Sequence, residues 1–273
     1  MYKYLLSIVL SAVSVMSAQA QAQPLSRLTS YQDQSIVTDI RPLESISLDA
    51  DDLLKRSDMA RGGNLDGIRF NAELTSFKEG EEVNSFGMLI EAAGDDNLVS
   101  FTAPARSRGI SILVRSRNMW FLSPTTKRPV PISPRQRLLG EANNGDIATT
   151  NYSRDYDAVV IGEAKVEGID SYVLWLTAKE KNVTYQQVRY YIAKDSHLAL
   201  KSDFFTASDK MIKYALMSYG NTITLPDSQL KFIDEMKVYD AIRNDSMTIM
   251  KYFDIEARPI PASRFDRRAL MQG

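Results

Sequence analysis

The chain has 273 residues, no cysteine, and 33 basic against 34 acidic residues, so its formal net charge is -1. Without cysteine it can form no disulfide, no thiolate nucleophile and no cysteine-ligated metal site. Because the charge is balanced, the chain presents no overall basic surface for nucleic acid, and we expect no nucleic-acid partner.

The N-terminal residues are typical of a secretory signal peptide. Lys3 supplies a positive charge, residues 4–16 form an apolar run, and small residues follow, so cleavage is expected after Ala20 or Ala22. The apolar run is too short to span a bilayer. No cysteine follows it for lipid attachment. We therefore expect a soluble protein in an exported compartment, without a lipid anchor.

Removal of residues 1–22 leaves about 250 residues, which fits one domain with a sizeable core. We place this domain at residues 47–265, after an N-terminal lead-in at 23–46 and before a C-terminal tail at 266–273. No later segment reaches the roughly 18 consecutive apolar residues of a membrane helix.

Helix signals are few. Residues 47–61 predict an amphipathic helix, with Asp49 as N-cap, Asp52 in the capping-box position and two glycines at 62–63 as the stop. A second, short helix is predicted over 133–140, because a serine followed by a proline is a favourable helix start.

Most of the remaining chain predicts β-strands. Apolar and polar residues alternate in long runs that are separated by charged, Gly, Asn and Asp turns. This pattern indicates an antiparallel meander of about ten strands, and such a large sheet curves into a barrel or an incomplete barrel. The expected class is mainly β (α+β). The predicted strands are 67–77, 84–92, 97–103, 109–116, 157–166, 171–179, 183–193, 198–207, 211–220, 228–240 and 247–257.

A basic region extends over residues 97–140, which contain no acidic residue. One interpretation is a solvated face that is balanced by acids on neighbouring turns. The other is a surface for anionic lipid head groups or an acidic partner, at about 1 kcal/mol for each basic residue. Candidate contacts are Arg106, Arg108, Arg128, Arg135 and Arg137, and the region also holds Arg115, Arg117 and Lys127.

Signals for catalysis or metal binding are weak. His197 is the only histidine and stands in a predicted turn, so neither a zinc site nor a Ser-His-Asp arrangement is expected. Residues 143–146 could hold calcium, although a plain polar turn is the simpler interpretation. No glycine-rich phosphate loop is present, and no acid stands in a distinctive apolar setting. A pair of carboxylates for glycoside hydrolysis stays open as an alternative. We expect no catalytic residue, cofactor or metal.

Several short pieces of sequence occur in a recognisable order between residues 45 and 265. On these pieces the chain resembles the outer-membrane lipoprotein-sorting protein family, which is related to the LolA and LolB lipoprotein carriers. It differs after Gly140, where 141–146 replace an aromatic-containing run. The pieces are 101–106, Gly109, 118–120, Pro124, Arg128, 132–133, Arg137, Gly140, 155–157, 162–163, 166–168, 172–174, 184–185, 188–191 and Lys201.

The resemblance implies an incomplete barrel covered by a helical lid over an apolar cavity. It implies a lipid or acylated protein as cargo, transient contact with a membrane surface, and a possible partner among inner-membrane exporters of the resistance-nodulation-division type. The apolar block at 119–122 and the pair at 138–139 would lie at the cavity mouth or on the lid. The expected lining is Phe70, Leu74, Phe86, Met88, Ile90, Val99, Phe101, Met119, Trp120, Leu122, Leu138 and Leu139.

The favoured hypothesis is a periplasmic carrier that moves a lipid or lipidated protein toward the outer membrane. A 16-carbon acyl chain exposed to water costs roughly 12 kcal/mol, so a carrier needs an apolar pocket with a movable cover. The 11 methionines suit a pocket of irregular shape. Alternatives are a lipid-sensing module of the same fold that regulates a membrane partner, an all-β hydrolase, and apolar side chains that only fill a dry core.

Overall fold

The structure, a computed structural model, describes residues 36–43, 48–62, 65–126, 128–148 and 151–271. The expected signal peptide and residues 23–35 of the lead-in lie outside this part of the chain. Within it, no helix is both long and apolar enough to cross a membrane.

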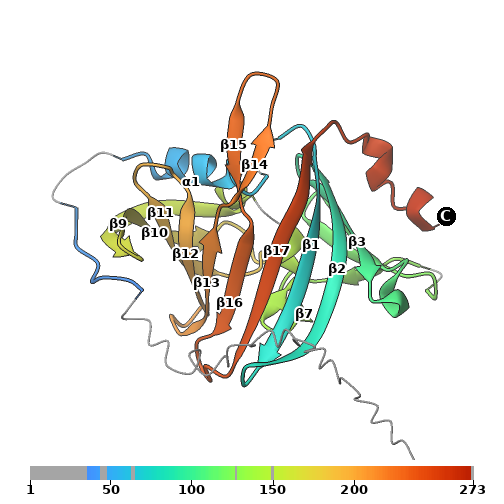
Figure 1. Cartoon of the computed structure of the whole chain (residues 1–273), viewed down its shortest axis with the longest axis horizontal. Helices are drawn as coiled ribbons and strands as arrows, with labels where there is room; N and C mark the ends of the chain where they lie inside the picture. Colours follow the sequence, from blue (N-terminus) through green and yellow to red (C-terminus); the bar gives the residue numbers. More distant parts are fainter. Residues whose placement is uncertain (1–35, 44–47, 63–64, 127, 149–150, 272–273) are drawn as a thin grey trace, which may run out of the picture.

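One antiparallel sheet of 13 strands dominates the molecule (Figure 1), as the alternating pattern predicts. Its spatial order is β6-β5-β4-β3-β2-β1-β17-β16-β13-β12-β11-β10-β9. The strands are β1 (Ile68–Lys78), β2 (Glu81–Ala93), β3 (Asp96–Ala103), β4 (Ser111–Arg115), β5 (Asn118–Leu122), β6 (Val130–Ile132), β9 (Tyr156–Val166), β10 (Ile169–Ala178), β11 (Gln187–Ala193), β12 (Ala199–Phe205), β13 (Met211–Ser218), β16 (Glu235–Asp240) and β17 (Ser246–Ala257).

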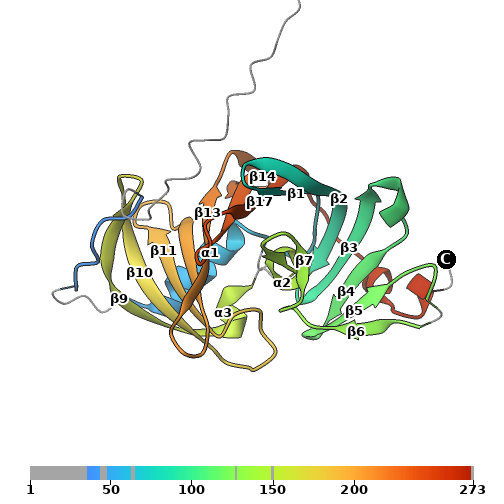
Figure 2. The same cartoon turned by 90° about the horizontal axis from the view of Figure 1, so that it is seen from below.

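The sheet curls strongly but does not close (Figure 2), because its end strands β6 and β9 do not pair with each other. Right-handed twist accumulates over 13 strands, and β-bulges add to the curvature. One bulge interrupts β1 between Arg69 and Asn71, and another interrupts β10 between Val173 and Leu174. The expected mainly β, incomplete barrel is confirmed.

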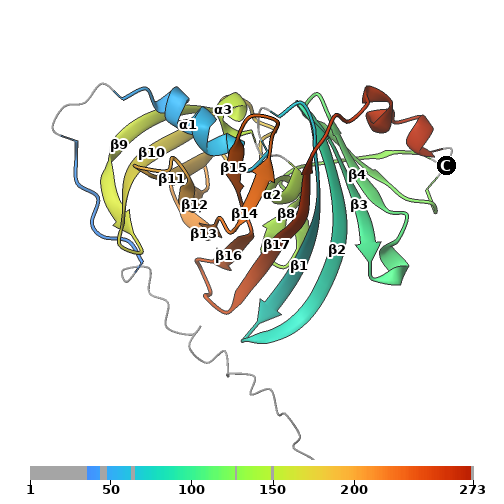
Figure 3. The same ribbon diagram turned by 45° about the horizontal axis from the view of Figure 1, so that its top comes forward.

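Short elements complete the fold. The helices are α1 (Ala50–Met59), α2 (Asn144–Ala148) and α3 (Tyr152–Asp155), with single 3-10 turns η3 (Ala105–Ser107), η4 (Ala262–Phe265) and η5 (Ala269–Met271). Two small hairpins pair β7 (Arg137–Leu139) with β8 (Ala142–Asn143) and β14 (Asn221–Thr224) with β15 (Gln229–Phe232). Figures 2 and 3 show α1, α2 and α3 on the concave side of the sheet.

The first predicted helix is confirmed. The Asp49 carboxylate accepts the backbone N–H groups of Asp51 and Asp52 at 3.0 and 3.1 Å, which satisfies two donors at the start of α1. Leu53 and Leu54 of this helix are buried in the large apolar cluster that also contains side chains of the sheet. The chain leaves the helix at Gly62, whose φ of 89° is a left-handed conformation that suits glycine.

Two details of the prediction are wrong. Residues 133–140 form a turn followed by β7 rather than a helix, because the apolar pair at 138–139 joins the concave core through a hairpin. The single strand predicted over 228–240 is divided between β15 and β16. Its break at Ile233 and Asp234 lets the two halves pair with different partners, β14 and β13.

The lead-in covers one edge of the sheet. Val37 and Arg41 form isolated antiparallel bridges to Val166 and Glu163 of β9. The Thr38 N–H donates to the Lys165 carbonyl at 3.0 Å. An open strand edge invites pairing with other chains, so this segment occupies an edge that would otherwise be available for aggregation.

The β7–β8 hairpin rests on the concave face, and its turn fits closely. Gly140 has a φ of 51°, and a Cβ there would lie 2.4 Å from Thr248 Oγ1 and 2.6 Å from Ser76 Cβ. The adjacent Glu141 N–H donates to Thr248 Oγ1 at 2.7 Å. The hairpin is therefore held against β1 and β17 at van der Waals contact.

We expect Gly140→Ala to lower the free energy of unfolding by about 2–4 kcal/mol, since backbone strain and overpacking add. Gly94→Ala is the matched control, because Gly94 has a similar φ of 56° and open space around it. It should lose only about 1 kcal/mol. Urea unfolding of both variants measures this, and equal losses would show that the hairpin does not press on the sheet.

Candidate functional site

The concave face of the sheet carries a continuous apolar cluster. Residues expected to line a cavity belong to it and are almost fully buried: Phe70, Leu74, Met88, Ile90, Val99 and Phe101. Phe86 is half-buried and packs edge-on against Phe101, with ring centroids 5.3 Å apart. The Phe70 ring lies 5.5 Å from that of Phe232. Strand parity thus brings together side chains from distant parts of the sequence.

The apolar block at 119–122 is divided between the two faces. Met119 joins the concave cluster together with Leu139, and Leu138 packs against it. Trp120 and Leu122 lie on the opposite face, in a second cluster with Ile260 and Phe265 of the C-terminal segment. Successive residues of a strand point to opposite faces, so the four residues of this block could not all face one cavity.

Short elements cover the concave cluster. We use "the cover" for α1, the β7–β8 hairpin, α2 and α3. Leu53 and Leu54 of α1, Ile147 of α2 and Tyr152 of α3 are buried in the cluster. The helical lid that the resemblance implies is present in this form. In this structure the cover packs closely, and a cavity of about 20 Å³ at its edge has room for about one water molecule.

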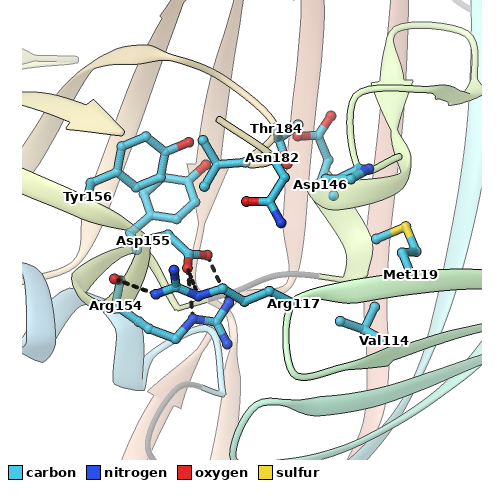
Figure 4. A pocket seen from close by; sticks show the side chains of 13 residues that line it. Val114, Arg117, Met119, Asp146, Arg154, Asp155, Tyr156, Asn182 and Thr184 are labelled. Atoms are coloured by element: carbon cyan, nitrogen blue, oxygen red, sulfur yellow. Dashed lines mark hydrogen bonds and ion pairs between the residues drawn. The ribbon is translucent and has the colours of Figure 1, made fainter. Parts of the chain in front are cut away.

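That cavity lies in the gap of the unclosed sheet (Figure 4), between the β4–β5 turn and α3. Charged groups join the two sides. Arg117 lies 3.6 Å from the Asp155 carboxylate and donates to the Arg154 carbonyl at 3.3 Å. Arg154 pairs with Asp95 at 2.5 Å and with Asp155 at 2.8 Å. We call Asp95, Arg117, Arg154 and Asp155 the gap clasp.

The five arginines expected to meet head groups or a partner are all exposed. Arg108 donates to the Thr102 carbonyl at 3.0 Å, and Arg135 donates to the Val183 carbonyl at 2.9 Å and also to that of Lys181. The remaining three are Arg106, Arg128 and Arg137. In the same basic region, Arg117 belongs to the gap clasp, so part of this positive charge pairs within the protein.

Charged residues are buried between the cover and the sheet, and four of them are Asp58, Arg61, Asp146 and Lys213. The Asp58 carboxylate accepts the backbone N–H groups of Tyr152 and Ser153 at 3.0 and 2.8 Å. The Asp146 carboxylate accepts the Asn143 N–H at 2.8 Å and the Tyr185 hydroxyl at 2.9 Å.

The other two members carry positive charge. Lys213 donates to the Asn143 side chain at 3.2 Å and to the Glu141 carbonyl. The Arg61 guanidinium lies 5.0 Å from the centroid of the Tyr152 ring. We call these four residues the buried charged cluster. It links α1, α2 and the start of α3 to the concave face.

Burial controls protonation in this cluster. It raises the pKa of Asp58 to about 6, against the opposing effect of the two backbone N–H groups. Burial also raises the pKa of Asp146, and it lowers the pKa of Lys213. Each of these three shifts favours the uncharged form of the group, as expected where water is excluded, whereas Arg61 keeps its charge.

Comparison with known proteins agrees with this architecture. Residues 93–272, more than half of the chain, match a family model described as an uncharacterized protein. The structure is similar to that of a LolA superfamily protein of Nitrosomonas europaea, with a TM-score of 0.73 and 25% identity over 82% of this chain and 100% of the other. The chain belongs to the family that this model describes, and it has the fold of the LolA superfamily.

Two further structures share this LolA-like fold. A DUF1329 family protein of Desulfovibrio piger has a TM-score of 0.68 and 22% identity over 81% of this chain and 97% of the other. An outer membrane lipoprotein-sorting protein domain of Vibrio parahaemolyticus has a TM-score of 0.67 and 17% identity over 81% and 98%. No curated protein matches the chain.

In this LolA-like chain, the surroundings of two acidic residues differ from the sequence prediction. Asp58 and Asp146 both stand in buried settings with raised pKa values, whereas no acid was expected there. Residues 143–146 form β8 and the start of α2 rather than a polar turn, and their side chains are buried. His197 stands in a turn, half-buried, with a φ of 57°. Within the described ranges, no group of three metal-binding side chains occurs.

The pKa of Asp58 predicts a pH effect on stability. A carboxyl whose pKa is about 6 when folded and about 3.9 when unfolded binds more protons in the folded chain. Its contribution to stability is therefore present below about pH 4 and is lost as pH rises toward 6, by about 3 kcal/mol in total.

We expect Asp58→Asn to remove this dependence. The free energy of unfolding of the variant minus that of the wild type should rise by about 2–3 kcal/mol from about pH 4 to pH 7. Urea unfolding at both pH values measures it. A difference that is the same at both pH values would show that Asp58 titrates normally.

Proposed function

We propose that this protein is a non-enzymatic periplasmic carrier that holds the acyl chain of a lipid or lipidated protein between the concave face and the cover. The observation that supports this most is the apolar cluster on the concave side of an unclosed sheet, covered by short elements in a LolA-like fold. Delivery toward the outer membrane is part of the proposal.

Energetics favour this use of the concave face. A 16-carbon chain carries about 12 kcal/mol of unfavourable hydration, which burial on an apolar face removes. The face holds five methionines, and their unbranched side chains adapt to ligands of irregular shape. These are Met88, Met119, Met217, Met236 and Met250.

Binding requires the cover to move away from the sheet. The concave side chains that an acyl chain would meet, such as those of Leu74, Met88 and Met250, are almost fully buried by other parts of the protein. Opening would expose apolar surface, but it would also return the buried charged cluster to water, which offsets part of that cost. An acyl chain would then take over the apolar contacts that the cover gives up. Apolar contacts favour the closed cover and burial of the charged cluster opposes it, so the cover can open and close reversibly as the ligand is loaded.

The exposed arginines support a transient contact with anionic head groups during loading or release. An inner-membrane exporter of the resistance-nodulation-division type is the proposed donor of the cargo. A lipid sensor with the same fold is the second candidate. It would bind the same lipid in one-to-one ratio but would not transfer it between vesicles, so a transfer assay separates the two functions.

The absence of cysteine from the sequence permits a direct test by disulfide locking. A Cβ on Gly145 of α2 would lie 3.0 Å from Thr184 Cβ in the β10–β11 connection. The pair G145C and T184C is close enough to form a disulfide after a small adjustment. This bond would tie the cover to the far side of the gap.

We expect the wild type to bind hexadecanoate at near one-to-one stoichiometry by native mass spectrometry. The oxidised G145C/T184C pair should bind less than about a tenth as much, and reduction should restore binding, because an acyl chain needs an open cover. The control pair T75C/S85C joins neighbours on β1 and β2, whose hydroxyls are 3.4 Å apart, and should bind normally when oxidised. A wild type that binds no acyl ligand would contradict the proposed function.

A further inference from the structure

Arg61 is a charged residue in an unusual position for a lipid-binding face. Its side chain is buried, with the residue 4% exposed, directly after α1 on the concave side of the sheet. In the described part of the chain it forms no ion pair with a carboxylate. A guanidinium keeps its charge at any physiological pH, and a buried charge without an opposite partner is strongly unfavourable. The arrangement therefore favours binding of an anion.

Aromatic side chains surround this guanidinium. The centroid of the Tyr152 ring lies 5.0 Å from it, and Tyr190, Tyr219 and Tyr252 are near enough to influence its pKa. Burial raises the pKa of each of these phenols, so all four stay neutral and keep their hydroxyl protons. Protonated phenols can donate hydrogen bonds to an anion, whereas they cannot neutralise the arginine themselves.

The nearby carboxylates already have other partners. Asp58 accepts from the backbone N–H groups of Tyr152 and Ser153. Asp146 accepts from the Asn143 N–H and from the Tyr185 hydroxyl. Both interact with Arg61 at longer range, since its charge is a minor influence that lowers their pKa values. Neither acid is the direct counter-ion of Arg61.

The arginine also stands at the boundary of the apolar surface. Tyr190 and Tyr252 belong to the concave apolar cluster, and the ring of Tyr252 lies 5.9 Å from that of Phe70. Tyr152 lines the cavity at the gap. A ligand with an apolar chain on the concave face could thus place its end group beside Arg61 and reach it through the gap.

We propose that Arg61 binds the anionic end of the ligand, a carboxylate or a phosphate attached to an acyl chain. This inference rests on the proposed carrier function and specifies its ligand class. When the cover opens, the two oxygens of such a group would accept parallel N–H bonds from the planar guanidinium, and the Tyr152 hydroxyl would supply a further donor. The Tyr219 hydroxyl already donates to the Ala199 carbonyl at 2.7 Å, and that of Tyr252 donates to the Met250 sulfur.

The test compares three probes that share a 16-carbon chain: hexadecanoate, hexadecyl phosphate and hexadecan-1-ol. The wild type should bind at least one of the two anions about tenfold or more tightly than the alcohol, and the preferred anion distinguishes a fatty acid from a phosphate head group. Arg61→Met should bind all three equally, with affinity for the alcohol unchanged. Arg61→Lys should keep part of the preference. Arg56→Met is the matched control, because Arg56 is exposed on α1 and pairs with Asp52.

Each outcome is decisive. Equal wild-type affinity for the anions and the alcohol would overturn this inference and leave the carrier function standing. Binding of none of the probes would overturn both. If Arg61→Met does not fold, the wild-type comparison of the three probes decides alone. A preference that survives in a folded Arg61→Met would also overturn the assignment.

Discussion

The constraint on which the structure depends is an apolar concave face on a sheet that does not close. In a closed barrel, strands on all sides bury the interior, but here the edges at β6 and β9 stay apart. Side chains such as Leu74, Met88 and Met250 would meet water without the cover. Each fully buried side chain of this size is worth about 1.5–3 kcal/mol, so the uncovered face would be strongly destabilised. Either the cover or a ligand has to occupy it.

The composition of the cover suits a reversible arrangement. A cover held by apolar contacts alone would close more firmly the more surface it buried. Here it also buries Asp58, Arg61, Asp146 and Lys213. Each of these charged groups loses favourable hydration when the cover closes on the sheet. The gap clasp adds polar contacts at the opening, and its Arg154 and Asp155 are mostly buried. Apolar burial and charge desolvation therefore act in opposite directions on the same interface.

This balance relates the fold to the proposed function. A carrier has to bind its cargo tightly enough to hide an acyl chain and loosely enough to release it. The cover can return to the sheet when the ligand leaves, because the concave cluster is then filled by Leu53, Leu54, Ile147 and Tyr152. An anionic end group beside Arg61 would give the ligand an advantage that the closed cover lacks.

The sequence predicted the sheet well because strand parity is a local property. Alternation along β1, β2 and β3 identified Phe70, Leu74, Met88 and Val99 as one face, and the structure buries them together. The same reasoning treated 119–122 as one block, although alternation sends Trp120 and Leu122 to the opposite face.

The buried charged cluster was not predicted from the sequence. Asp58 lies on α1, and its partners Tyr152 and Ser153 are 94 and 95 residues away along the chain. A local sequence pattern cannot identify an acid or an arginine that is buried by residues so distant along the chain. The helix predicted at 133–140 failed for a related reason, since contact with the distant strands β1 and β17 selects a hairpin there.

The proposed function requires the cover to separate from the sheet while the sheet stays folded. Hydrogen exchange of the wild-type protein, followed by mass spectrometry with and without hexadecanoate, tests this most directly. We expect the backbone amides of α1 and α3 to exchange at least about tenfold faster than those of β1 and β17, through local opening. We also expect the ligand to change exchange in the cover and in the concave strands. If cover and sheet exchange together through global unfolding, and the ligand changes neither, the proposed function is contradicted.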